Sequence, residues 1–403
     1  MRSRAMHIAA GLALLASTLP APAKAAGAEP LQAFQMVRSL QVVQDRLASG
    51  DHAALPMQRK LLEMIDKRLR ETGPEGYADP RNFRALMVYA MSGGNPVTVA
   101  AVLSRLTLDE RDRSIGDGIL AYLNGDIVSA RSTLAAIDAL SLPHEAGAFL
   151  ALVKGSVSAA EEPAEALKLF DRARLLGPGT LVEEAALRRS VDLSATTGDA
   201  ARFMLASTQY VTRYLRSPYA SQFADSFVSG VIALHASIDL ETIDDITAMM
   251  DADQEQAVYL RIARRAAIEG FSELSAFAAG KVQHQPGNSD DPRALLYASL
   301  SSVTTGTADE IRGKLARIDR GQLSQGDRQL FDAVAAVAAK LTAAVPALPQ
   351  PAPALPPIAA SLPAAAVQTP TAKPGPEAPA EALIAETRRK LDEIDKLLEG
   401  ELQ

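Results

Sequence analysis

A pattern of small and large apolar residues that recurs about every 36 residues constrains this fold more than any other feature of the sequence. In its clearest copy, Ala166, Phe170 and Ala173 lie at offsets of 0, 4 and 7, and Pro178 follows at offset 12. These offsets share one helix face: the small residue admits a partner helix, and the large one fills the space beside it. Proline ends the helix because it has no N–H. The pattern predicts the second helix of an antiparallel pair.

Two further copies flank this one, 36 residues before it and 35 residues after it. They are Ala130, Leu134 and Ile137, and then Ala201, Leu205 and Thr208. Gly118, twelve residues before Ala130, supplies the small contact residue expected on the preceding helix. A helix pair repeated at this period resembles the tetratricopeptide class. An irregular bundle of helical hairpins is the alternative, because the sequence has no tryptophan and the period exceeds the usual one of about 34 residues.

One recurring sequence signal predicts where helices start: a side chain that can cap the helix precedes a proline at the first helical position. The four examples are Asp79-Pro80, Asn95-Pro96, Ser217-Pro218 and Asp291-Pro292. With glycine-containing turns, they divide residues 31–343 into roughly 17 helices, and no segment alternates long enough to require a strand. We therefore predict an all-α solenoid of eight or nine hairpins, at about 34 residues each, with a concave surface available for a partner. The period fades after Ala201, so a separate C-terminal bundle is the alternative for the later helices.

The N-terminus has the three parts of a secretory signal peptide. Arg2 and Arg4 precede an apolar run over residues 8–19, and Ala23-Lys24-Ala25 forms a small-residue cleavage site. The run is shorter than the roughly 20 apolar residues that span a bilayer. We predict cleavage of residues 1–25, export to the periplasm, a helical-repeat domain over residues 26–343 and no membrane span after cleavage.

Composition excludes several classes of function. The chain has no cysteine, which removes lipid anchors on cysteine, disulfides, thiolate zinc sites and cysteine nucleophiles. The net charge is −7, and loss of Arg2, Arg4 and Lys24 with the signal peptide leaves −7 − 3 = −10. A chain this acidic repels nucleic acid and anionic lipid, so neither is an expected partner.

No catalytic, metal or cofactor motif emerges. His144-Glu145 begins like a zinc-protease helix, but Ala148 stands where the second histidine is needed. The remaining histidines of the mature chain are scattered singly, at His52, His235 and His284. Adjacent acidic pairs occur near expected helix starts, at Glu161-Glu162, Glu183-Glu184, Asp244-Asp245 and Asp290-Asp291. Neighbouring side chains on a helix point in different directions, so these pairs are poor acid–base partners, and we predict a protein that is not an enzyme.

A proline-rich segment separates the repeats from the end of the chain. Residues 346–379 hold 11 prolines and 10 alanines in 34 positions. Proline disfavours both helix and sheet, so residues 344–379 are expected to be an extended linker, reaching on the order of 100 Å at about 3.1 Å per residue. A disordered tail without a role is the alternative.

Residues 380–403 carry a narrow apolar seam at spacings of 3, 4, 3 and 4. Its members are Ile384, Thr387, Leu391, Ile394 and Leu398. They predict an amphipathic helix that is only marginally stable alone and needs a surface to cover its seam. The repeats of the same chain, a second copy and a partner are the three candidate surfaces, and our hypothesis is docking on a partner or a second copy.

The first mature helices resemble the MotC family, the periplasmic motility proteins of the rhizobial group. The resemblance is carried by residues 34–46, 50–62 and 82–86, by Tyr89 and by residues 92–96, and it continues to about Leu341. It implies a periplasmic component needed for flagellar rotation that acts through the periplasmic part of the MotB stator subunit. A dedicated periplasmic chaperone and self-association are further candidate partners. Two other functions stay open: a general periplasmic adaptor or chaperone-like scaffold, and a cell-wall-modifying enzyme or its accessory subunit.

Overall fold

The chain is entirely helical in the part that the structure describes. The computed structural model describes residues 31–285, 287–301 and 307–343, and these contain 17 α-helices, three 3-10 helices and no strand. The all-α prediction and the expected number of helices are confirmed for this part. The predicted signal peptide (1–25), linker (344–379) and C-terminal helix (380–403), with its seam from Ile384 to Leu398, lie outside the described residues.

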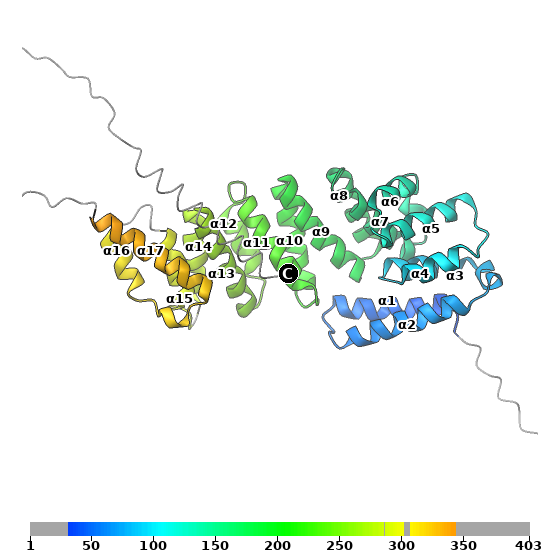
Figure 1. Ribbon diagram of the computed structural model, residues 1–403, viewed down its shortest axis with the longest axis horizontal. Coiled ribbons are helices and arrows are strands. Elements are labelled where there is room, and N and C mark those ends of the chain that lie inside the picture. Colours follow the sequence, from blue (N-terminus) through cyan, green and yellow to red (C-terminus); the bar gives the residue numbers. More distant parts are fainter. Residues whose placement is uncertain (1–30, 286, 302–306, 344–403) are drawn as a thin grey trace, which may run out of the picture.

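In chain order the elements are α1 (Ala33–Ala48), α2 (Ala54–Glu71), η1 (Pro74–Ala78), α3 (Pro80–Met91), α4 (Pro96–Leu103), α5 (Glu110–Leu123), α6 (Ile127–Leu134), η2 (Ala139–Ser141), α7 (His144–Ser158), α8 (Pro163–Leu176), α9 (Leu181–Thr197), α10 (Ala200–Tyr214), α11 (Ala220–Ala233), α12 (Leu240–Thr247), α13 (Ala252–Glu269), α14 (Ser272–His284), α15 (Pro292–Ser301), α16 (Ala308–Leu315), η3 (Arg320–Gln322) and α17 (Gln325–Ala343). Successive helices pack as hairpins, for example α5 with α6, α7 with α8, α9 with α10 and α13 with α14. The described helices form an elongated body, with α9 and α10 near its middle (Figure 1).

Two large apolar clusters make up most of the core, and they meet in α9. Val182 and Ala186 belong to the cluster that extends over α1 to α9, whereas Leu187 and Val191 belong to the cluster that extends over α9 to α17. The second cluster runs without a break from Phe223 in α11 to the last described helices. The later helices therefore share this second cluster with α9 and α10.

The repeated small-and-large pattern is the contact between the two helices of a hairpin. Ala166, Phe170 and Ala173 are all buried in α8, as predicted. The ring of Phe170 lies against Gly155 of α7, where an added Cβ would come within 2.6 Å of it. Leu134 of α6 fills the same kind of space beside Gly118 of α5. A glycine on the first helix thus makes room for the large residue on the second.

The predicted register of the third copy is wrong. Leu205 in α10 is 57% exposed and Ala201 is also exposed. The buried face instead carries Phe203, Ser207 and Tyr210, which have the same offsets of 0, 4 and 7 with the large and small residues exchanged. The reason lies in α11, because the ring of Phe203 contacts Gly230, and this small residue lets a large one stand where alanine stands in the other copies.

Three of the four predicted proline starts are confirmed. The side chains of Asp79, Asn95 and Asp291 each accept the backbone N–H two residues later, at the start of α3, α4 and α15. Ser217 also accepts such a bond, from the N–H of Tyr219, but α11 begins only at Ala220. That motif forms a turn before the helix.

The N-terminal hairpin folds back across the other helices. Helix α1 packs on α3 and α9, and the Gln41 Nε2 donates to the Glu145 carbonyl at the start of α7 (3.5 Å). At its far end, a ring nitrogen of His52 lies 2.8 Å from the Arg216 carbonyl oxygen. Figure 1 shows α1 and α2 side by side along one edge of the body. The face between α3 and α9 is therefore covered by this chain itself, which restricts where a partner can bind.

Candidate interaction surface

Five tyrosines tie helices together through carboxylates, and each carboxylate also pairs with a cation. The five tyrosine–carboxylate–cation sets are Tyr89, Asp66 and Arg70; Tyr210, Glu184 and Arg188; Tyr214, Glu183 and Arg213; Tyr259, Asp244 and Lys281; and Tyr297, Asp327 and Arg264. In every set the hydroxyl donates across to another helix, over 2.7–3.0 Å. Burial raises the pKa of all five tyrosines, that of Tyr89 to about 12. The hydroxyls are held as hydrogen-bond donors and serve as interhelical anchors.

Two of these anchors converge on the first turn of α9. Glu183 accepts from the Gly179 N–H (2.6 Å), the Tyr214 hydroxyl (2.7 Å) and Arg213 (2.5 Å). Glu184 is fully buried and accepts from Tyr210 (2.8 Å) and Arg188 (3.2 Å). The positive end of the helix dipole favours both carboxylates here. Their separate partners confirm that neighbouring acidic side chains diverge, so this pair is not an acid–base device.

The position predicted for another acidic pair is wrong. Asp244 and Asp245 lie in the second half of α12, away from its start. Asp244 is instead held by Lys281 of α14 and Tyr259 of α13. The Lys281 ammonium lowers the pKa of Asp244, with a smaller lowering contribution from the Tyr259 hydroxyl. An ion pair with another helix therefore explains the position of the Asp244 carboxylate, and the residues next to Asp244 in the sequence do not reveal it.

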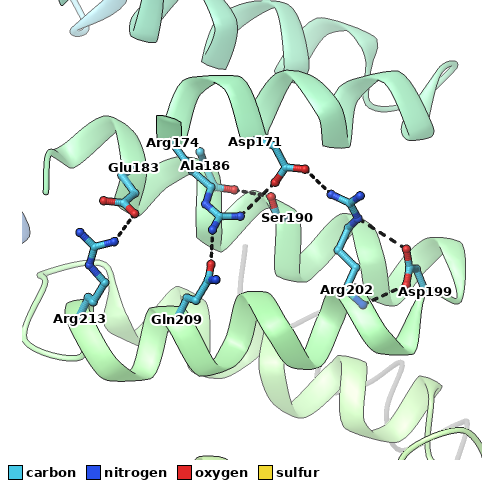
Figure 2. A network of polar contacts seen from close by, with 9 residues as sticks. All are labelled: Asp171, Arg174, Glu183, Ala186, Ser190, Asp199, Arg202, Gln209 and Arg213. Carbon is cyan, nitrogen blue, oxygen red and sulfur yellow. Dashed lines mark hydrogen bonds and ion pairs between the residues drawn. The ribbon is translucent and has the colours of Figure 1, made fainter. Parts of the chain in front are cut away.

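A row of arginines joins α8 to α10. Figure 2 shows Arg174 of α8 reaching Gln209 of α10, and Arg202 of α10 reaching back to Asp171 of α8 (2.6 Å). Arg174 also pairs with Asp171 (3.0 Å). Farther along α10, Arg213 extends toward Glu183 and is 43% exposed. The row holds α10 in a fixed position beside α8 and lines its surface with guanidinium groups.

Four side chains on α8, on α10 and in the connection from α12 to α13 are here together called the α10 surface. It consists of Leu175, Leu205, Thr212 and Met249. Leu175 is 81%, Leu205 57% and Met249 44% exposed, and the Thr212 Oγ1 lies 3.7 Å from the Met249 sulfur. Methionine and arginine are both enriched at protein interfaces. We take the α10 surface as the candidate interaction site.

The absence of a catalytic or metal site along the whole chain stays a prediction. His144 is exposed and lies 3.8 Å from Glu145, and His235 stacks on Phe271, with ring centroids 3.6 Å apart. Among residues 31–285, 287–301 and 307–343, no three histidine or acidic side chains are grouped as metal ligands. No helix within these ranges is both long and apolar enough to cross a bilayer.

The sequence reasoning missed both the tyrosine anchors and the α10 surface. One local signal existed. Tyr210 and Tyr214 are four residues apart, so they share one helix face, and the adjacent Glu183 and Glu184 offer one carboxylate for each hydroxyl. Which carboxylate each tyrosine meets depends on how α9 and α10 pack, which no local pattern contains.

Comparisons with known proteins agree along the whole chain. A family model described as "Chemotaxis protein MotC" matches residues 1–403. A protein of Rhizobium meliloti (strain 1021) with the same description is 36% identical over 428 residues, covering 97% of this chain and 98% of that protein. No solved structure matches. A family model and a relative that both span nearly the full length show that the chain belongs to the MotC family.

Proposed function

We propose that this protein is a periplasmic motility protein required for flagellar rotation. It binds the periplasmic part of the MotB stator subunit and biases stator assembly or energy coupling. The observation that carries the proposal is membership of the MotC family over the full chain, since both the family and the relative are described as chemotaxis proteins. The predicted signal peptide over residues 1–25 supports a periplasmic location.

The helical hairpins support a binding role. We infer that they form a tetratricopeptide-like solenoid, in which each pair buries its apolar face against its neighbours and leaves an extended outer surface. A protein of this kind acts on a stator only through a difference in affinity between two stator states. Arg202 and Arg213 of α10 support such contact at the α10 surface, because Asp171 and Glu183 hold their guanidinium groups in place before any partner arrives.

The C-terminal segment supplies a second contact in this proposal. The linker over residues 344–379 acts as a tether, and the seam of Ile384, Thr387, Leu391, Ile394 and Leu398 docks on the partner or on a second copy. A dedicated periplasmic chaperone is a further occupant of either contact.

The test is binding of the mature protein to the soluble periplasmic part of MotB, measured by calorimetry. Leu205→Glu places a charge on the α10 surface, and Val128→Glu is the matched control because Val128 is 67% exposed on α6. A chain ending at residue 343 tests the C-terminal segment. We expect Leu205→Glu to weaken binding and Val128→Glu to leave it unchanged.

The other outcomes are equally informative. Loss of binding only in the shortened chain moves the contact to the C-terminal segment. Comparable binding to several unrelated envelope proteins favours the general adaptor. Absence of binding in every variant, together with normal swimming after deletion of the gene, rejects the proposed function.

A further inference from the structure

Two half-exposed methionines lie in one line along α2, the second helix of the N-terminal hairpin. Met57 is 48% and Met64 is 45% exposed. The partly buried Leu61 stands between them, at spacings of 4 and 3, so the three side chains share one helix face. They are here called the α2 stripe. Helix α2 packs mainly against α1 and α4, and its most fully buried side chains include Ile65 and Leu69, so the methionines lie at the edge of this contact.

Such a stripe is unusual on the first hairpin of a helical array. A terminal hairpin ordinarily has a polar outer face, which keeps the array soluble. Methionine is enriched at interfaces, and its flexible side chain adapts to a neighbour. Within the hairpin, Val43, Leu47 and Ala54 form a small apolar cluster of their own, apart from the two large ones. A further apolar side chain laid over α2 would therefore enlarge a thin core.

The C-terminal segment, residues 380–403, has the complementary sequence pattern. Its predicted seam repeats the spacings of 4 and 3 found in the α2 stripe, which lets the side chains of two helices interlock. The charges are also complementary. Helix α2 holds five basic and three acidic residues, or 5 − 3 = +2, in a mature chain of net charge −10. Residues 391–403 hold one basic and five acidic residues, or 1 − 5 = −4.

Two lysines border the α2 stripe on its exposed side. Lys60 is 70% and Lys67 is 77% exposed, and they are seven residues apart, as the methionines are. Each pairs only with an acidic side chain of the same helix, Glu63 at 2.9 Å and Glu71 at 3.7 Å. Exposed pairs of this kind contribute little to stability. Both lysines are therefore available to the carboxylates of a docking helix.

The place where the described chain ends favours the segment of a second copy. Helix α17 lies at one end of the elongated body, and α2 lies in the opposite half (Figure 1). A proline-rich linker, as predicted over residues 344–379, is a semi-rigid spacer, and it would have to follow the body toward its other end to reach its own α2. A second copy that lies antiparallel brings its α2 beside the α17 of the first. The two-fold axis then gives both copies the same contact.

We propose that two copies of this protein pair by exchanging their C-terminal segments. The acidic half of each segment, residues 391–403, docks on the α2 stripe of the other copy, and its carboxylates meet Lys60 and Lys67. This inference rests on the second contact of the proposed function, and it gives that contact its surface and its occupant.

The experiment is sedimentation velocity of the mature protein, residues 26–403, over a range of concentrations. We expect an equilibrium between monomer and dimer. Met57→Glu combined with Met64→Glu should weaken the dimer by at least about tenfold, because a charge buried in an apolar contact without a partner is costly. Val97→Glu combined with Val128→Glu is the matched control, at positions 73% and 67% exposed, and should have no effect. A chain that ends at residue 343 should be monomeric.

A mixture separates exchange between copies from docking within one chain. The protein with Met57→Glu and Met64→Glu keeps its C-terminal segment, and the chain that ends at residue 343 keeps its α2 stripe. The two should therefore associate with each other, although neither pairs alone. Circular dichroism confirms that each variant is folded, and Lys60→Glu combined with Lys67→Glu replaces the methionine variant if that one fails to fold.

Two results would overturn the proposal. Docking of the segment on its own chain gives a monomeric mature protein and no association in the mixture. A contact elsewhere gives a dimer that persists in the chain ending at residue 343. MotB is absent from every sample, so these results are independent of whether MotB binds.

Discussion

Substituting alanine for Gly155 tests the close helix contact on which the repeat pattern depends. An added Cβ would lie 2.6 and 2.7 Å from two ring atoms of Phe170, and 3.2 Å from the Ala166 carbonyl oxygen. The ring is enclosed in the core, so it has little room to move away. Gly280 is the matched control, because it also stands in the last two turns of a helix and a Cβ there meets nothing within 4 Å.

The two substitutions should shift stability in opposite directions. Replacing glycine by alanine within a helix stabilises by roughly 0.5–1 kcal/mol. Overpacking a filled core costs typically about 1–3 kcal/mol. Gly280→Ala receives only the gain, whereas Gly155→Ala receives both effects. The difference in unfolding free energy between the two variants should therefore be about 1–3 kcal/mol, which is the overpacking cost alone.

Urea unfolding followed by far-ultraviolet circular dichroism measures this difference. A third variant, Phe170→Leu, removes the ring atoms nearest to Gly155. In that background, Gly155→Ala should lose most of its cost, which appears as a coupling energy in a double-mutant cycle. If Gly155→Ala stabilises the protein as much as Gly280→Ala does, α7 and α8 do not approach as described and the reasoning is refuted.

Three further predictions rest on other contacts. Phe203→Ala should lower the unfolding free energy by about 3–5 kcal/mol, whereas Leu205→Ala should change it by less than about 0.5 kcal/mol. If urea unfolding shows a larger loss for Leu205→Ala than for Phe203→Ala, the register predicted from the sequence is correct for α10. Tyr214→Phe removes a donor from the buried Glu183 carboxylate and should cost about 1–3 kcal/mol in the same assay, so an unchanged midpoint would show that this anchor adds no stability. Burial raises the pKa of Tyr89 from 10.0 to about 12, so its contribution to stability is complete below pH 10.0 and is lost as the pH rises toward about 12. Phenolate absorbance should therefore develop at higher pH in the folded protein than in urea, and identical titrations in both states would contradict the described burial of the tyrosines.

The helices were predictable because their signals are local. Caps such as Asp79 and Asn95 need only the next two residues to form, and the face of Ala166, Phe170 and Ala173 is set by the helical period. The errors occurred where a distant residue decided the outcome. The register of α10 depends on Gly230, which lies 27 residues after Phe203 (230 − 203) on another helix.

The candidate site was largely outside the reach of the sequence. The predicted seam of Ile384 to Leu398 lies outside the described residues and stays a prediction. The α10 surface was hidden because Leu205 was assigned to a buried face. The nearby pair of Asp171 and Arg202 was also out of reach, because the two residues are 31 positions apart and meet only where α8 and α10 lie beside each other.

The sequence by itself determined that the chain is a series of helices, and it placed the buried face of α8 on Ala166, Phe170 and Ala173. A helix face is defined by residues three and four apart, and caps by residues two and three apart, so both are present in any short segment. Only the tertiary structure decided that α1 folds back onto α3 and α9, and that the buried Glu184 accepts a hydrogen bond from Tyr210. An apolar stripe in the sequence indicates that one helix face is buried, but it does not indicate which other helix covers that face. The covering helix depends on how the whole chain packs.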